Sequence, residues 1–446
     1  MATLTLQAIS QLIGAKFSGV DAPFTGVAID SRRIKKGELF IALKGQQVDG
    51  HLFIRQAEAL GAAGFLVSQP IDTKLAVIEL ENTLQGLAQI ARVYRQQFTI
   101  PIIAVTGSSG KTTVKEMLSS ILKKVYKIHV TQGNYNNEIG LPLTLLGLQT
   151  THECAVIEMG ARRLTDIQYL MDIAHPTLSL ITNVSTAHLE IFGSTENIAI
   201  AKGEIYKYLS PQGTAIINKD EAYVSYWKSL LTTQDIITFG MTNQADISVA
   251  NFRLEATQSC FTVITPLSRA EINLPVAGLH NIKNALAAIA VAYALKIDLS
   301  IIKEGLESFQ GVQSRLECKP GINGATIIDD TYNANPDSVK AALQVLQNRK
   351  GKKIFIMGDM LELGAESIKA HQDIGLYATN LSIDALYTYG ILAKEAVSTF
   401  GKHAKHFTEK YDLIAAITCE LEANTTVLVK GSRGMHLEEV VAELLA

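Results

Sequence analysis

Residues 102–113 read IIAVTGSSGKTT: an apolar strand leads into a glycine-rich turn that closes with Gly-Lys-Thr. Apolar residues then recur at helical spacing, at Val114, Met117, Leu118, Ile121, Leu122 and Val125. Strand, turn and helix in this order cradle a polyphosphate, because N–H groups of the turn and of the helix N-terminus point at the anion. The stretch therefore predicts ATP or GTP binding, against the alternative of a glycine turn with an incidental lysine.

Individual loop residues have expected roles in binding the nucleotide. Lys111 can reach the terminal phosphates, and the Thr112 hydroxyl can hold Mg²⁺. The longer motif G-x-x-x-x-G-K-[ST] would require glycine at position 105, where this chain has valine, so the loop is of a G-x-x-G-K-T kind. The residues expected to bind nucleotide here are Gly107, Ser108, Ser109, Gly110, Lys111, Thr112 and Thr113.

The composition is that of a globular, cytoplasmic protein. Its 446 residues suggest about three domains of ~150 residues each. A formal net charge of −3 argues against a general nucleic-acid or membrane-surface binder. We expect no membrane span and no signal peptide, because no apolar stretch is long enough and the first residues lack a basic region followed by an apolar one. The scattered cysteines indicate free thiols rather than a disulfide framework or a zinc site.

The pattern along the chain predicts an α/β protein of three domains. Residues 1–98 read as short strands and helices of a smaller α/β N-terminal domain. Residues 99–312 alternate strands and helices, and their continuously apolar strands predict a parallel sheet buried on both faces. Residues 313–446 alternate again and predict a doubly wound, Rossmann-like C-terminal domain. The main central elements expected are strands at Ile102–Val105, Cys154–Glu158, Leu178–Asn183, Gly213–Asn218 and Asp235–Phe239, and a helix at Asn281–Leu295.

Several polar residues follow apolar strands, where ligands sit in such sheets. Glu158 ends a strand near the phosphate loop and can bind Mg²⁺ directly or through water, although alone it would as readily face solvent. His188 follows another strand of the same sheet, but a lone histidine is more often a structural hydrogen-bonding residue. Lys202 lies on an expected helix, where composition favours a solvated surface lysine.

Four further residues are candidates for nucleotide contacts. Asn281 and Asn284 share a helix face, and paired amides can read the edge of a nucleobase, unless Asn281 merely caps the helix. Asp330 follows a strand and can take ribose hydroxyls, unless this segment only initiates the next helix. Arg315 can cross a cleft to a phosphate or be an ordinary surface arginine.

Together these residues resemble the Mur ligase family, the ATP-dependent amide ligases of peptidoglycan precursor synthesis. The resemblance spans nearly the whole chain, and the missing first glycine of the phosphate loop is normal in that family. It is weakest in the N-terminal domain. The motifs that carry it are Thr106–Thr113 with Val114–Met117, Asn134–Gly140, Asp329–Ser338, Gly358–Gly364 and Val429–Arg433.

The resemblance implies a catalytic centre around the phosphate loop. Lys111 would bind the ATP phosphates and Thr112 the first Mg²⁺, while Glu158 and His188 would serve the metal sites. Lys202 matches the family lysine that CO₂ carbamylates, which places an anion beside a second Mg²⁺ and reverses the surface interpretation.

The resemblance also implies binding residues beyond the loop. Adenine, phosphate and ribose would be contacted by Asn281, Asn284, Arg315 and Asp330. The UDP-sugar end would be held by the N-terminal passages Asp30–Arg32, including Ser31 and Arg32, and Lys44–His51. The incoming dipeptide would lie near Asn335, Lys430, Ser432 and Arg433.

The implied reaction joins D-alanyl-D-alanine to UDP-N-acetylmuramoyl-tripeptide through an acyl phosphate, in a monomeric cytoplasmic enzyme that serves cell-wall synthesis, cell shape and cell division. The passages 332–335 and 358–364 favour this step over the preceding one, which adds the third residue. Carboxylate and γ-phosphate are both anionic, so Lys111 and two Mg²⁺ ions are needed to offset their repulsion. A C-terminal domain that closes on ATP would exclude water from the acyl phosphate.

Two other functions stay open at this point. One is a related ligase with another amine acceptor, such as a folate-polyglutamate or cyanophycin-type enzyme. The other is a phosphate-loop NTPase switch, which would hydrolyse ATP without any amine acceptor. The sequence also leaves open whether the third peptide residue is lysine or diaminopimelate.

Overall fold

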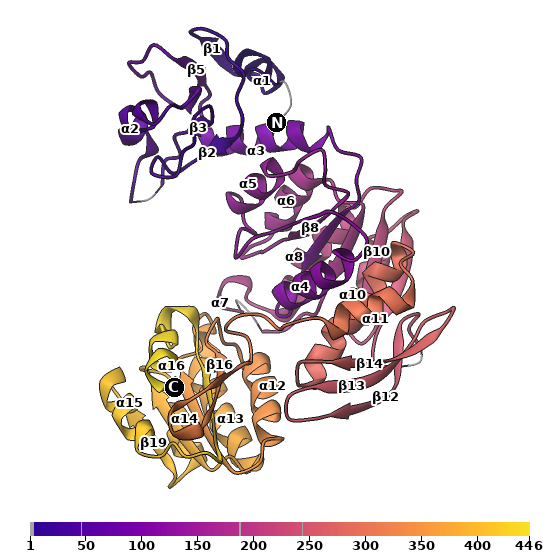
Figure 1. Ribbon diagram of the computed structural model, residues 1–446, viewed down its shortest axis with the longest axis vertical. Helices are drawn as coiled ribbons and strands as arrows, with labels where there is room; N and C mark the ends of the chain where they lie inside the picture. The colour runs from indigo at the N-terminus through magenta and orange to yellow at the C-terminus, as the bar shows by residue number, and fades with distance from the viewer. Residues whose placement is uncertain (1–3, 46, 187–188, 243) are drawn as a thin grey trace.

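The computed structural model describes residues 4–45, 47–186, 189–242 and 244–446. Figure 1 shows an N-terminal body at one end of the long axis, a C-terminal body at the other, and a central body between them. Among the described residues, no helix combines the length and the apolar character that a membrane crossing requires.

The N-terminal body is built on a five-stranded sheet in the order β1-β5-β4-β3-β2. The pairs are parallel except that β1 runs antiparallel to β5. Its elements are α1 (Leu6–Leu12), β1 (Lys16–Ser18), β2 (Val27–Ala28), β3 (Leu39–Ile41), η1 (Gly50–Phe53), α2 (Ile54–Ala59), β4 (Gly64–Val67) and β5 (Ala76–Glu79).

The central body holds the predicted parallel sheet, in the order β11-β10-β9-β6-β8-β7, and every described pair in it is parallel. All residues of β6, β8 and β9 are buried, as their continuous apolarity predicts. Its elements are β6 (Ile102–Thr106), α4 (Lys111–Leu122), β7 (Ile128–Val130), α5 (Gly140–Leu146), β8 (Cys154–Glu158), α6 (Asp166–Ala174), β9 (Leu178–Ile181), α7 (Leu189–Phe192), α8 (Thr195–Lys207), β10 (Thr214–Asn218), α9 (Val224–Ser229) and β11 (Asp235–Phe239).

An antiparallel sheet inside the central body was not expected from the strand and helix alternation. Its strands β12 (Ser248–Leu254), β13 (Ser259–Ile264) and β14 (Arg269–Leu274) precede α10 (Leu279–Ala294) and α11 (Leu299–Glu307). Helix α10 touches α4 and β10 as well as β13, so it is enclosed between this sheet and the parallel one. Its alanine-rich, nearly all-apolar sequence reflects that enclosure, because a helix covered on most sides has no polar face.

One predicted helical position is wrong. The apolar spacing predicts that Val125 is the last apolar position of the helix after the phosphate loop, but Val125 lies beyond the end of α4 at Leu122 and is 38% exposed. Helix α4 ends earlier, and the N–H groups of Lys124 and Val125 bond to Ile121 and Leu122 in a tightened last turn.

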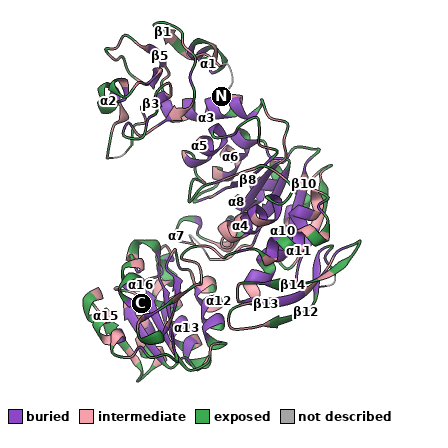
Figure 2. Cartoon of the chain, in the orientation of Figure 1, coloured by how far each residue is buried: buried purple, intermediate pink, exposed green. Residues whose placement is uncertain are grey.

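The C-terminal body is the predicted doubly wound unit, with strand order β15-β16-β20-β17-β18-β19. Neighbouring residues of one strand enter different cores: Ile328 joins the cluster on one face and Ile327 the cluster on the other. Figure 2 shows the buried strands inside this body and the exposed segments of helices around them. Its elements are β15 (Glu317–Pro320), η2 (Ile322–Gly324), β16 (Thr326–Asp330), α12 (Pro336–Gln347), β17 (Lys352–Gly358), η3 (Gly364–Glu366), α13 (Ser367–Asn380), β18 (Ala385–Tyr389), α14 (Glu395–Phe400), β19 (Ala404–Phe407), α15 (Lys410–Thr418), β20 (Thr425–Lys430), η4 (Arg433–Met435) and α16 (Glu438–Leu444).

Helix α3 (Thr83–Arg95) fastens the N-terminal body to the central one. The buried guanidinium of Arg95 donates from Nε to the Ala174 carbonyl at 2.8 Å, from Nη1 to Phe98 at 2.6 Å and from Nη2 to His175 at 3.0 Å. Ala174 and His175 end α6, so the positive charge also meets the negative end of that helix.

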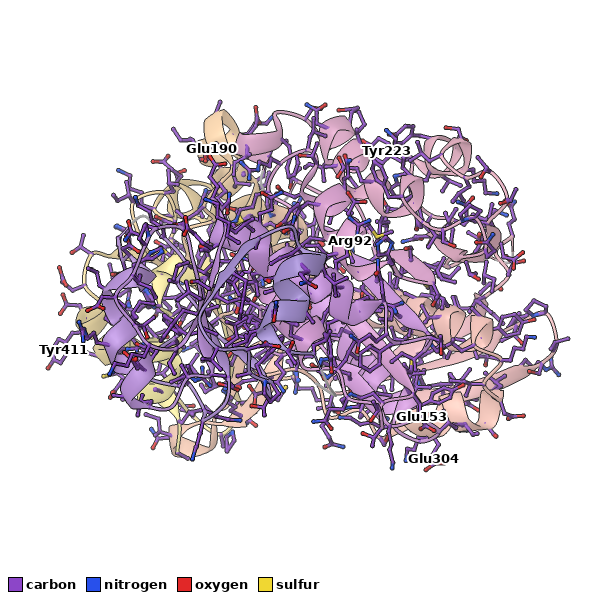
Figure 3. All side chains as sticks on the ribbon, turned by 90° about the horizontal axis from the view of Figure 1, so that it is seen from above. Arg92, Glu153, Glu190, Tyr223, Glu304 and Tyr411 are labelled. Atoms are coloured by element: carbon purple, nitrogen blue, oxygen red, sulfur yellow. The ribbon has the colours of Figure 1, made fainter. Side chains whose placement is uncertain are left out.

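We expect Arg95→Leu to lower the melting temperature by about 5–10 °C, since each buried carbonyl left without a donor costs roughly 1–3 kcal/mol. The measurement is differential scanning calorimetry. Arg92→Leu is the matched control, because Arg92 lies on the same helix but is exposed (Figure 3). Equal melting temperatures for the two variants would contradict this role of Arg95.

Candidate functional site

A cleft of about 1770 Å³ runs between the three bodies. Its walls begin at Asn82 and Gln85 on the N-terminal side of α3, pass the phosphate loop, and end at Lys430 and Ser432 after β20. The carboxyl ends of the central and C-terminal parallel strands therefore open into one shared space, as expected for ligand sites in such sheets.

Glycine is required at both ends of the phosphate loop. Gly107 has φ 153°, and a Cβ there would lie 1.8 Å from Oγ1 of Thr182. Gly110 has φ 77° as the N-cap of α4, and its Cβ would lie 2.5 Å from Oδ1 of Asn284. The loop is thus pressed against the segment after β9 on one side and against α10 on the other.

Hydrogen bonds lock this loop to the segment after β9. The Ser108 N–H donates to the Asn183 carbonyl at 3.0 Å, and the Ser109 N–H donates to Oδ1 of Asn183 at 3.1 Å. The Thr182 hydroxyl donates to the Ser109 carbonyl at 2.6 Å. Thr182 and Asn183 were not identified from the sequence as residues that support the phosphate loop. The run of polar residues that follows β9 could have indicated this role.

Thr112 and Glu158 meet at the opening of α4. The Thr112 hydroxyl donates to Oε2 of Glu158 at 3.0 Å, and the Asn136 amide donates to Oε1 at 2.8 Å. The carboxylate is buried, and the Glu158 N–H is held by the Thr131 hydroxyl at 3.0 Å. Asn136 belongs to a motif quoted for the family resemblance but had no assigned role; here it orients the carboxylate.

Lys111 and Lys202 bring two amines into the same buried region. Lys202 lies on α8 and is 3% exposed, so the interpretation as a solvated surface lysine is wrong. Burial and the nearby charge of Lys111 lower the pKa of Lys202 to about 7. Burial also lowers the pKa of Lys111, whose ammonium donates to the Gly107 carbonyl at 2.8 Å. The Glu158 carboxylate acts on Lys111 in the opposite direction and Arg315 in the same direction, so positive groups outnumber negative ones around Lys111 and favour a bound anion.

Arg315 reaches this region from the C-terminal side. Its Nη2 donates to the Thr112 hydroxyl at 3.1 Å, which is a direct contact between the linker to the C-terminal body and the phosphate loop. Asp330 instead forms a buried ion pair with Lys430, with Oδ2 and Nζ at 2.6 Å. Lys430 also donates to the Asn333 carbonyl at 2.9 Å. Lys430, which the resemblance places near the dipeptide, therefore binds two groups of the C-terminal body itself.

The remaining C-terminal candidates lie around the same rim. Asn335 caps α12 by accepting from the Ser338 N–H at 2.9 Å, within a full capping box. The Ser432 hydroxyl accepts from the Leu361 N–H at 2.9 Å. The exposed Arg433 forms an ion pair with Glu438, with 3.5 Å between Nη1 and Oε1.

The two N-terminal candidates lie apart from the rest. The Ser31 hydroxyl donates to Oε1 of Gln56 at 2.8 Å, and exposed Arg32 pairs with Asp30 at 2.8 Å. Within the described residues, neither Ser31 nor Arg32 lines the cleft. His188, an expected catalytic and metal-site residue, lies outside the described residues.

Asn281 and Asn284 line the cleft from α10. Asn281 does not cap the helix, because Gly278 holds that position; its amide donates to the Ala277 carbonyl at 2.8 Å. Glu221, missed by sequence reasoning, accepts from the Val184 N–H at 3.1 Å, and burial raises its pKa to about 6. Glu221 thereby holds the segment that follows Asn183.

The donor set suits Mg²⁺ bound together with phosphate. Among the described side chains, no group of three or more His, Cys, Asp or Glu is placed to hold a metal ion. Thr112 and Glu158 instead offer one hydroxyl and one buried carboxylate beside the loop. Mg²⁺ prefers oxygen ligands and is usually held by one or two carboxylates plus substrate phosphates, so these residues fit it.

Comparison with known proteins settles the family. Matches cover residues 23–96 as "Mur ligase family, catalytic domain", 105–292 as "Mur ligase middle domain" and 314–433 as "Mur ligase, glutamate ligase domain". UDP-N-acetylmuramoyl-tripeptide--D-alanyl-D-alanine ligase of Escherichia coli (strain K12) is 37% identical over 100% of this chain and 99% of the relative. The chain belongs to the Mur ligase family.

Solved structures of the family share the three-domain fold. Crystal structure I of MurF from Acinetobacter baumannii superposes with a TM-score of 0.93 at 35% identity and covers 98% of each chain. MurF ligase from Thermotoga maritima in complex with ADP gives a TM-score of 0.85 at 28% identity, and covers 94% of this chain and 96% of that one.

We expect Gly107→Ala to weaken nucleotide binding by roughly 100-fold or more, because a clash that displaces the loop costs several kcal/mol of binding free energy. Calorimetric titration with ATP would measure the loss. Gly14→Ala is the control, since Gly14 also has a positive φ of 68° but no heavy atom within 4 Å of its Cβ. Unchanged affinity in Gly107→Ala would show that the loop does not bind the phosphates.

Proposed function

We propose that this chain is an ATP-dependent, ADP-forming ligase that joins D-alanyl-D-alanine to UDP-N-acetylmuramoyl-tripeptide in peptidoglycan precursor synthesis. The observation that carries the proposal is the convergence of Lys111, Lys202, Glu158 and Arg315, drawn from separate elements, on one cleft shared by three bodies. The full-length likeness to ligases of that name supports the choice of substrates.

The three bodies divide the work of binding. Residues 1–98 hold the UDP-sugar end, residues 99–312 hold ATP, and residues 313–446 bring the dipeptide and close over the nucleotide. The contact between the Glu190 N–H and the Glu362 carbonyl, at 3.2 Å, shows that the central and C-terminal bodies already touch across the cleft. The chain acts as a cytoplasmic monomer in this proposal, because one chain supplies all the proposed site residues.

The chemistry follows from the charges at the site. ATP gives its γ-phosphoryl group to the terminal carboxylate of the tripeptide, and the dipeptide amine then displaces phosphate from the acyl phosphate to form the amide. Both first reactants are anions, so Lys111 and Arg315 offset their repulsion and stabilise charge on the transferred group. Thr112 and Glu158 would hold Mg²⁺, which would supply further neutralisation of the phosphates.

Lys202 serves this chemistry as a carbamate. A buried amine whose pKa is lowered to about 7 has both its neutral and its charged form populated near physiological pH, and the neutral amine is the form that attacks CO₂ and then loses a proton. The carbamate replaces the charged form beside Lys111 with an anion, which removes the repulsion between the two amines. It also adds a negative oxygen ligand for a second Mg²⁺.

Mass analysis of the products tests the reaction itself. Incubation of the protein with ATP, Mg²⁺, UDP-N-acetylmuramoyl-tripeptide and D-alanyl-D-alanine should yield the UDP-linked pentapeptide together with ADP and phosphate. Parallel reactions with lysine or diaminopimelate in the tripeptide identify the third residue. ATP turnover without an acceptor would indicate an NTPase switch, and product with another amine acceptor would indicate a related ligase.

Replacement of Lys202 tests the carbamate. Lys202→Ala should lower turnover by about 100-fold or more, and a short carboxylic acid should partly restore it, because the acid supplies the missing anion. The fraction of carbamylated wild type, followed by NMR with ¹³C-labelled bicarbonate, should rise between about pH 6 and about pH 8 rather than near the ordinary lysine pKa of about 10.4. Full activity of Lys202→Ala would remove the carbamate from the mechanism.

A further inference from the structure

The linker between the central and C-terminal bodies holds Arg315 in a constrained backbone frame. The residues on either side of it, Ser314 with φ 56° and Leu316 with φ 54°, both adopt the left-handed conformation. This conformation costs free energy for residues other than glycine. Two such residues within three positions are therefore stable only where surrounding contacts hold the backbone in place.

Those contacts come from the end of β16 and its neighbours. The Ser314 N–H donates to Oε2 of Glu317 at 3.0 Å, and the Leu316 N–H donates to Oδ1 of Asp330 at 3.2 Å. The Tyr332 N–H in turn donates to the Ser314 carbonyl at 3.2 Å. The backbone of Arg315 is thereby tied to the segment that carries Tyr332.

The side chains of Arg315 and Tyr332 are in contact as well. The guanidinium carbon of Arg315 lies 4.1 Å from the centre of the Tyr332 ring, while its Nη2 reaches the Thr112 hydroxyl at 3.1 Å. Among the described residues, the Tyr332 hydroxyl makes no hydrogen bond, so the ring face is what Tyr332 contributes to the contact.

An aromatic ring is a suitable support for a phosphate-binding arginine. A carboxylate in its place would neutralise the guanidinium and occupy its N–H groups, whereas a ring face holds the planar cation and leaves both its charge and its donors available. The nearby carboxylate of Asp330 is already paired with Lys430, with 2.6 Å between Oδ2 and Nζ. The charges of Asp330 and Arg315 still attract each other, but among the described residues no carboxylate forms an ion pair with Arg315, so its remaining N–H groups face the cleft without a carboxylate partner.

We propose that Tyr332 is a positioning residue whose ring holds the guanidinium of Arg315 over the phosphate loop, ready for the ATP phosphates. The inference rests on the proposed function, because it takes ATP as the ligand that Arg315 meets. Tyr332 also lines the cleft, but the role assigned to it here is exerted through Arg315.

The test compares Tyr332→Phe and Tyr332→Leu in steady-state kinetics with ATP varied at saturating acceptor. Tyr332→Phe should stay within about twofold of wild type, because the ring is kept. Tyr332→Leu should lose about 5- to 30-fold in kcat/KM for ATP, the range expected for a partly desolvated cation–π contact, with KM for D-alanyl-D-alanine unchanged. In an Arg315→Ala background, Tyr332→Leu should cause no further loss, because the group it positions is gone.

Arg315→Lys provides a second variant that leaves Tyr332 in place. It keeps the charge but loses the planar group that stacks, so it should fall between wild type and Arg315→Ala. Tyr377→Leu is the control, since it removes another cation–π contact in the same body, with Lys340 at 5.9 Å, away from the cleft. Melting temperatures of all variants separate local misfolding from loss of positioning.

Three results would overturn the inference: Tyr332→Leu with wild-type kcat/KM for ATP, a loss confined to KM for D-alanyl-D-alanine, or additive losses in the double variant. Failure of the proposed function can be distinguished from failure of this inference, because the wild-type protein would then make no pentapeptide. In that case, calorimetric titration of the same variants with a non-hydrolysable ATP analogue measures the same positioning effect without turnover.

Discussion

Positive charge gathered around the phosphate loop is the constraint on which this site depends. Lys111 and Lys202 come from different elements of the central body, and burial and the charge of Lys111 lower the pKa of Lys202. Burial and Arg315 lower the pKa of Lys111, and the Glu158 carboxylate offsets part of that effect. Arg315 adds a third positive group from the linker to the next body. Like charges held together in a protein interior favour the binding of an anion, and a polyphosphate with a carboxylate is such a partner.

The architecture supplies the rigidity that this arrangement needs. The parallel central sheet presents the phosphate loop and Glu158 from adjacent strands, since β6 pairs with β8. Asn183 and Thr182, which follow the neighbouring strand β9, lock the loop from its other side. Helix α10 closes the back of the site, and its enclosure by the antiparallel sheet β12-β13-β14 fixes where Asn281 and Asn284 lie.

The two outer bodies are attached in different ways, which suits their proposed roles. The buried Arg95 joins the N-terminal body to the end of α6 by two hydrogen bonds, to the Ala174 and His175 carbonyls, so the proposed UDP-sugar site keeps its position relative to the loop. Among the described residues, the C-terminal body meets the central one through hydrogen bonds that include Arg315 with Thr112 and Glu190 with Glu362. Hydrogen bonds of this kind can break and re-form, so the C-terminal body can move to close over a nucleotide.

The parallel central sheet, the doubly wound C-terminal unit and the phosphate loop could be predicted from the chain, because apolar strand runs, helical periodicity and the glycines of the loop are local patterns. Resemblance to a family added candidate residues such as Lys202, which composition alone would place at the surface. The folded chain was needed to show which polar groups pair: Lys430 with Asp330, Asn136 with Glu158, and Arg315 with Tyr332. It also decided the antiparallel sheet around α10. Such pairings join residues far apart in the chain, and no local pattern encodes the distance between them.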